Sequence, residues 1–146
     1  MDVFDNILMG FRVALSAQNL LFCLIGTIYG TLIGVMPGIG PVVGVAILIP
    51  VTFGLNATTA IITMAGVYYG AMYGGSTTSI LINVPGESAS VVTCLDGYEM
   101  AKRGRAGAAL GIAAIGSFVG GSVATFGLAY VFRMLYVLLP RGILGI

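Results

Sequence analysis

The most informative feature of this sequence is what it lacks, which is charge along its first half. Only 8% of the 146 residues are charged, and no charged side chain lies between Arg12 and Glu87. A soluble domain carries about 25% charged residues, so this composition is that of a membrane protein. A Lys or Arg at the centre of a bilayer costs roughly 2.5–3.5 kcal/mol, which is a reason for so long an uncharged segment.

Histidine, paired cysteines and clustered basic charge are also missing, and each absence removes a class of function. The sequence has no His, and its two cysteines, Cys23 and Cys94, are far apart, so we expect no Zn or other Cys/His metal site. The net charge is +1, whereas nucleic acid binding needs clustered basic residues. The start, Met1 to Asp5, is acidic, so we expect no cleavable signal peptide.

What the sequence does contain is apolar helical sequence interrupted by Gly and Pro, and it predicts an all-α polytopic membrane protein. Residues 19–36 predict a helix of about 27 Å, which nearly crosses a bilayer. Residues 42–53 predict a half-helix or a strongly tilted span, and residues 57–73 another helix with Asn56 as its cap. Three glycines spaced four residues apart predict close contact with a neighbouring helix: Gly26, Gly30 and Gly34.

Four segments follow from these patterns. Residues 1–17 predict an amphipathic helix that lies along the headgroups or packs on a partner subunit, and the pattern favours neither. Residues 18–86 hold the broken transmembrane helices. Residues 87–105 carry three basic side chains, which predicts a cytoplasmic segment. Residues 106–140 predict a further transmembrane helix, and the hydrophobic sequence at the end of the chain suggests the N-terminal part of a longer transporter.

Two stretches contain residues that break membrane helices, Met36–Pro41 and Tyr73–Ser79. Broken backbone at membrane depth is tolerated only where protein or a water-filled cavity receives its polar groups, so we interpret both as walls of a polar site. A half-helix that begins at Pro41 would present free N–H groups and about half a positive charge to an anionic substrate. The candidate substrate- and ion-binding residues are Pro37, Gly38, Gly40, Gly74, Gly75, Ser76, Thr77, Thr78, Ser79, Asn83 and Glu87.

Each part of this candidate site has a purely structural alternative. The Pro37–Pro41 stretch can also be a mere kink between packed helices. The Gly74–Ser79 hydroxyls can serve only to satisfy helix carbonyls. Glu87 can be an ordinary carboxylate in the first turn of a helix rather than a cation or proton site.

Four motifs resemble the large membrane subunit of the tripartite tricarboxylate transporters, the TctA family. They span residues 34–41, 68–81, 85–98 and 100–107, so the resemblance covers nearly the whole chain. Members of that family are several times longer, and this chain is similar to their N-terminal part.

This resemblance implies a subunit of the bacterial inner membrane with several crossings. It implies a small membrane subunit and a periplasmic solute-binding protein as partners. It also implies import of tricarboxylates or other carboxylates, such as citrate, coupled to a Na⁺ or H⁺ gradient, with no cofactor beyond that ion.

The residues themselves bear on three classes of function. A transporter subunit is the leading interpretation. A membrane-embedded enzyme is not expected, because the sequence has no His base and Ser76 has no visible partner that would activate it. A truncated scaffold or assembly fragment without transport activity remains the alternative, favoured by the glycine stripes and the short chain.

Overall fold

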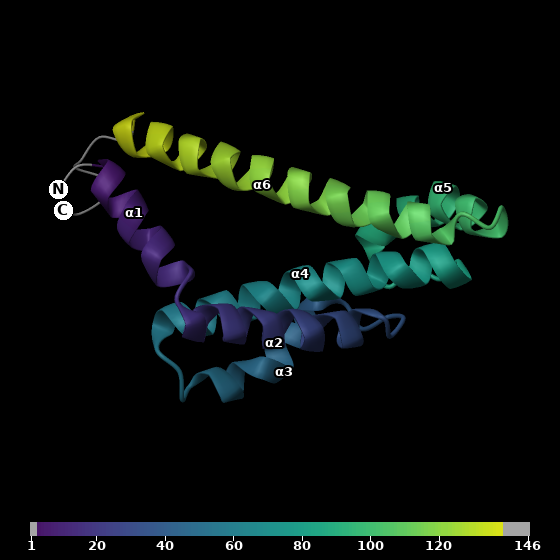
Figure 1. The fold of residues 1–146 in the computed structure, drawn as a ribbon, viewed down its shortest axis with the longest axis horizontal. Coiled ribbons are helices and arrows are strands. Elements are labelled where there is room, and N and C mark those ends of the chain that lie inside the picture. Colours follow the sequence, from purple (N-terminus) through teal and green to yellow (C-terminus); the bar gives the residue numbers. More distant parts are fainter. Residues whose placement is uncertain (1–2, 139–146) are drawn as a thin grey trace. The chain divides into compact units, whose positions relative to one another are not determined.

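The computed structural model describes residues 3–138, and every regular element in that range is helical, as the sequence predicts. The chain forms two compact units, one that ends at Leu110 and one that begins at Gly111. In chain order (Figure 1) the elements are α1 (Val3–Ala14), α2 (Ala17–Gly34), α3 (Pro41–Thr52), α4 (Ala57–Ile82), the short 3₁₀ helix η1 (Ser88–Ser90), α5 (Val91–Lys102) and α6 (Ala106–Leu138).

The core of the first unit is a close pair of parallel helices, α2 and α4. A Cβ added to Gly26 would lie 2.5 Å from the Thr63 carbonyl oxygen, and Gly30 and Gly34 face the backbone of the next turns of α4 in the same way. The predicted glycine contact is therefore confirmed. It is matched by a second stripe on α4 that packs against the backbone of α2 and comprises Gly66, Gly70 and Gly74.

Buried hydrogen bonds join the N-terminal ends of the two helices. The Asn19 amide donates to the Val13 carbonyl at 2.7 Å and accepts from the Thr59 hydroxyl at 2.6 Å. Asn56 caps α4, as predicted, because its side chain accepts from the Thr59 backbone N–H at 2.9 Å. These bonds satisfy polar groups that would otherwise be costly to bury.

The short helix α3 returns the chain from the end of α2 toward the start of α4 (Figure 1). Its 12 residues correspond to about 18 Å. The first predicted break is confirmed: α2 ends at Gly34, Gly38 has a φ of +83°, and Pro41 occupies the first turn of α3. Pro suits that position because its missing N–H would have no partner in the helix.

The second predicted break is wrong. Gly74–Ser79 are not unwound, because α4 continues without interruption for 26 residues to Ile82. Four side chains that we expected to face a cavity instead donate hydrogen bonds to helix carbonyls one turn earlier, which satisfies them within the helix. These bonds run from Ser76 to Met72 at 3.2 Å, from Thr77 to Tyr73 at 3.0 Å, and from Thr78 and Ser79 to Gly75 at 2.9 Å each.

Helix α4 ends nine residues later than predicted, at Ile82 rather than at residue 73. Asn83 ends the helix in the left-handed conformation, with a φ of +57°. This conformation is common at helix ends, and Asn tolerates it better than most residues. Pro85 follows, and Pro is frequent just after a helix end because it cannot continue the helix.

Helix α5 packs on the last turns of α4, where Gly97 lies against the Ile80 side chain. An ion pair joins two exposed side chains of α5, because Lys102 Nζ lies 2.7 Å from Glu99 Oε1. That hydrogen bond holds the pKa of the exposed Glu99 carboxyl below its usual range.

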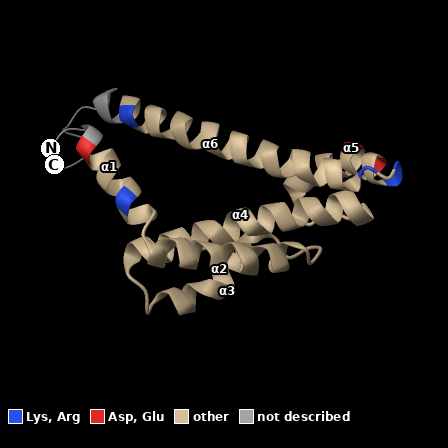
Figure 2. Cartoon of the chain, in the orientation of Figure 1, with Lys and Arg blue, Asp and Glu red and all other residues tan. Residues whose placement is uncertain are grey.

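Two helices in the described range are long and apolar enough to cross a membrane. They are α2, with a mean hydropathy of 1.4, and Ala106–Leu135 of α6, with 1.7, whereas α3 is apolar but shorter. Charged residues are absent from α2, α3 and α4 and lie over α1, the α5 region and the end of α6 (Figure 2). The predicted end of the last span, near Pro140, lies outside the described residues.

Candidate functional site

A cavity of about 660 Å³ lies in the first unit, where the first break meets the segment that follows α4. Three parts of the chain line it: the start of α3, one face of α4, and the turn into α5. The lining residues are Gly38, Gly40, Pro41, Val42, Tyr68, Met72, Pro85, Gly86, Glu87, Ser88, Ala89 and Val91. Two segments that are more than forty residues apart in sequence therefore share one cavity.

One wall of the cavity is the N-terminus of α3. Gly40 is the N-cap and has no side chain to bond the free amides. Because Pro41 has no N–H, Val42 supplies the first amide of the helix, and Val42 lines the cavity. A helix N-terminus carries about half a positive charge, so this wall favours an anion.

Glu87 is the one charged residue among those that line the cavity, and it brings a negative charge when ionised. Its backbone N–H donates to Ser90 Oγ at 3.2 Å, and Ser90 Oγ donates back to the Glu87 carbonyl at 2.9 Å. Glu87 is partly buried, and this burial raises the pKa of its carboxyl above the ordinary value. A carboxyl in such a place suits a proton or a cation.

The structure brings three of the predicted site residues to the cavity: Gly38, Gly40 and Glu87. Pro37 is exposed in the turn after α2, and Asn83 is exposed at the end of α4, and neither lines the cavity. Residues 74–79 do not line it either: Gly74 packs on α2, and Gly75 lies beneath the segment that carries Glu87.

Several lining residues were not predicted. Tyr68 and Met72 come from the middle of α4, and their spacing of four residues places them on one helix face. That spacing is visible in the sequence, but it is equally typical of residues that only pack between helices. Pro85, Gly86 and Ser88 belong to the motif at residues 85–98, yet the turn that brings them to the start of α3 depends on packing that the sequence does not show.

Within residues 3–138, no three side chains of His, Cys, Asp or Glu lie close enough together to hold a metal ion. Cys23 and Cys94 are free thiols, and both are partly buried. The polar groups of the cavity are its backbone amides and carbonyls, the carboxyl of Glu87, the hydroxyl of Ser88 and the phenol of Tyr68.

The sequence was then compared with known proteins. A family model described as the tripartite tricarboxylate transporter TctA family matches residues 20–141. A protein of Agrobacterium vitis, described as an uncharacterized 52.8 kDa protein in TAR-I ttuC' 3'region, is 55% identical over 129 residues. These residues cover 88% of this chain and 26% of that protein, so the chain spans about a quarter of the relative's length. No solved structure matches.

Proposed function

Because this chain belongs to the tripartite tricarboxylate transporter TctA family, we propose that it forms the N-terminal part of the large membrane subunit of a carboxylate importer. The family is one of transporters and not of enzymes. On this proposal the subunit works with a small membrane subunit and a periplasmic solute-binding protein. It imports tricarboxylates or other carboxylates across the bacterial inner membrane, coupled to Na⁺ or H⁺.

The proposed arrangement in the membrane is multi-pass. The length and hydropathy of α2 and α6 support a crossing by each of them. Helix α4 has 26 residues, or about 39 Å, which also exceeds the roughly 30 Å of a bilayer core. The basic residues between α5 and α6 place that segment in the cytoplasm on the positive-inside rule.

The observation that carries the proposal is the shared cavity, which joins the N-terminus of α3 to the carboxyl of Glu87. We assign the backbone at Gly38, Gly40 and Val42 to the substrate carboxylate. Glu87 is assigned to the coupling proton or cation. Residues 74–79 act beneath the cavity, and Pro37 and Asn83 shape the turns on either side of it.

Magnitudes show why a coupling ion belongs in this proposal. Removing a carboxylate from water costs several kcal/mol, and a helix terminus returns at most about 2 kcal/mol. An ionised Glu87 would repel the substrate as well. A proton or Na⁺ at Glu87, or basic groups from the remaining part of the transporter, must therefore supply the balance.

The test uses the full-length transporter with its partner subunits and measures uptake of radiolabelled citrate, succinate and malate. Glu87→Gln removes the charge, and Gly38→Ala forces a side chain into a φ of +83°. Such strain costs about 1–3 kcal/mol, so we expect uptake to fall roughly tenfold while the subunit still inserts and assembles.

Gly54→Ala is the matched control, because nothing lies within 4 Å of a Cβ at Gly54 in the described structure. It should transport normally. Full uptake by both cavity variants would contradict the proposal. Uptake that requires neither Na⁺ nor H⁺, in a transporter whose other part offers no basic group, would contradict the assignment of Glu87.

The alternative is a truncated membrane scaffold that assembles with partners and does not transport. The glycine-packed pair of α2 and α4 favours it, since such a pair is stable without any substrate. In that case the cavity variants would leave the function unchanged, and Gly30→Ala, which lies in the helix contact, would abolish assembly.

A further inference from the structure

The segment that carries Glu87 lies directly on the backbone of α4. A Cβ added to Gly86 would lie 2.5 Å from the Cα of Gly75 and 3.0 Å from the Gly34 carbonyl oxygen. Real Cβ atoms do not approach backbone atoms so closely. No side-chain rotation can relieve this contact, because both neighbours are backbone atoms of helices that are themselves packed together.

The surface of α4 beneath Pro85–Glu87 has no side chain at Gly75, which leaves room for this segment. The Gly75 carbonyl accepts the hydroxyls of both Thr78 and Ser79 at 2.9 Å. These bonds turn both hydroxyls toward the helix backbone, and Thr78 Oγ1 would lie 3.3 Å from a Cβ on Gly86. Residues 74–79 of α4 thus form the surface on which residues 85–87 pack, and they do not line the cavity.

We propose that Gly86 is a positioning residue for Glu87: its missing side chain allows the Pro85–Glu87 backbone to rest on α4 at Gly75, and this contact holds the Glu87 carboxyl at the cavity. The consequence for transport rests on the function proposed above. The positioning itself does not, and it can be measured without substrate.

The surroundings of Glu87 support this inference. Tyr68 of α4 is the other titratable group among the residues that line the cavity, and α3 and α5 contribute Pro41, Val42 and Val91, which do not titrate. From α2, the atom nearest to Gly86 is the Gly34 carbonyl oxygen, which carries no net charge. The protonation of Glu87 therefore depends on its burial against α4 more than on any neighbouring charge.

Two substitutions should move that protonation in opposite directions. Gly86→Ala forces the segment away from α4, exposes the carboxyl to water and lowers its pKa toward the ordinary value. Gly75→Ala places a methyl 3.6 Å from Glu87 Cγ, which is an ordinary contact, so this variant should fold. The added methyl removes water from the carboxyl and raises its pKa.

The measurement is the pH dependence of Glu87 labelling by dicyclohexylcarbodiimide, which reacts with protonated carboxyl groups, in the full-length protein in nanodiscs. Mass spectrometry quantifies the modified residue. We expect the labelling midpoint to move to lower pH in Gly86→Ala and to higher pH in Gly75→Ala.

Gly30→Ala is the control for a merely structural effect. It creates a contact at least as severe, with the backbone of Val67, and neither Gly30 nor Val67 lines the cavity, so it should destabilise the protein without moving the midpoint. The inference is overturned if Gly75→Ala leaves the midpoint unchanged or lowers it. It is also overturned if Gly30→Ala moves the midpoint as far as Gly86→Ala does.

The two proposals can fail separately. If the midpoints move as expected while Glu87→Gln transports normally, the positioning stands and the transport role of Glu87 is wrong. If Glu87→Gln abolishes uptake while both glycine variants keep the parent midpoint, the transport role stands and the positioning is wrong.

Discussion

Glycine is the residue on which the first unit depends, because its absence of a side chain brings two helix backbones together. In α2, a Cβ at Gly30 or Gly34 would overlap the backbone of α4, and Gly66 and Gly70 have the same relation to α2. Contacts of this kind gain van der Waals packing that larger side chains would prevent. The spacing of four residues keeps them on one face of each helix.

Replacing Gly30 by Ala should therefore destabilise the helix pair. The added methyl meets the Val67 backbone, and overpacking of this kind typically costs about 1–3 kcal/mol. Gly107→Ala is the control, because nothing lies within 4 Å of its Cβ and Ala favours a helix by up to about 1 kcal/mol. Thermal unfolding in detergent should show a lower midpoint for the first variant only, and equal midpoints would contradict the close contact.

Glu87 gives a prediction about stability and pH. Burial in the folded state raises the pKa of its carboxyl above the ordinary value of 4.5, so its contribution to stability is fully present below pH 4.5 and is lost as the pH rises through the folded-state pKa. Glu87→Gln removes this loss. We expect the variant to unfold at the same or a higher temperature than the parent at pH 7, with a smaller fall in unfolding temperature as the pH rises above 4.5, even though uptake falls.

A lower unfolding temperature of Glu87→Gln at pH 7 would contradict that account. It would mean that the ionised carboxylate stabilises the fold, as an ordinary carboxylate at a helix N-terminus does.

At the scale of elements, α4 shows how far the sequence could predict the fold. Its start was predictable, because Asn56 followed by two threonines is a recognisable cap, and the ends of α2 and α3 were predicted within about two residues. Its end was not, because a Gly-Ser-Thr run fits either a broken helix or a continuous one. Hydrogen bonds from the hydroxyls and the contact with α2 decide between them, and both depend on neighbours that the sequence does not specify.

The residues of the candidate site were likewise predictable only in part. Gly38, Gly40 and Glu87 were predictable because backbone breaks and an isolated carboxylate are visible in the sequence. Tyr68 and Met72 were missed, since residues in the middle of a helix reach a cavity only through packing.

The cap of α4 can be tested by itself. Asn56→Ala removes the acceptor for the Thr59 N–H and should cost about 1 kcal/mol of stability, whereas Asn56→Asp keeps an acceptor and should be close to neutral. Chemical denaturation in detergent measures both variants. Equal loss in both would mean that Asn56 acts through another contact.

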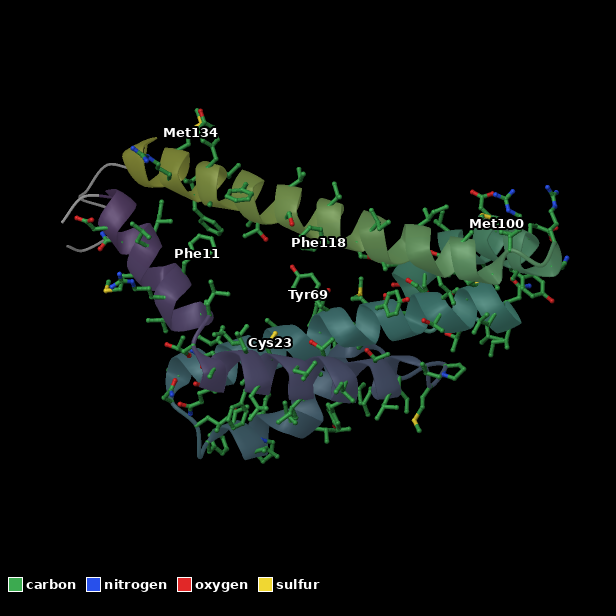
Figure 3. The ribbon with its side chains drawn as sticks, viewed as in Figure 1. Phe11, Cys23, Tyr69, Met100, Phe118 and Met134 are labelled. Atoms are coloured by element: carbon green, nitrogen blue, oxygen red, sulfur yellow. The ribbon has the colours of Figure 1, made fainter. Side chains whose placement is uncertain are left out.

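At the scale of the whole molecule, the chain has much more apolar surface than it covers. Most large apolar side chains of α6 are exposed, Phe118 and Phe126 by 76% and 75%, and Figure 3 shows Phe118 projecting from its helix. On the proposed function, lipid and other parts of a transporter would surround these side chains, since α6 is long and apolar enough to cross a membrane.

The orientation of the molecule in the membrane follows from its few charges. The segment between α5 and α6 carries Arg103 and Arg105, which we place in the cytoplasm. A cysteine in place of Asp96, with Cys23 and Cys94 replaced by Ala, should react with a membrane-impermeant maleimide in inside-out vesicles. Reaction in intact spheroplasts instead would reverse the proposed orientation.

The most direct measurement of the central claim is protection of the cavity by a carboxylate. In the same cysteine-free background of the full-length transporter, single cysteines replace Val42 and Ser88, which line the cavity, and Ile47, which does not and is 56% exposed. Citrate, succinate and malate are each added with Na⁺ before maleimide labelling. We predict that at least one of them slows labelling several-fold at positions 42 and 88 and leaves position 47 unchanged. If none of the carboxylates slows labelling at positions 42 and 88 relative to position 47, there is no substrate site between these two segments.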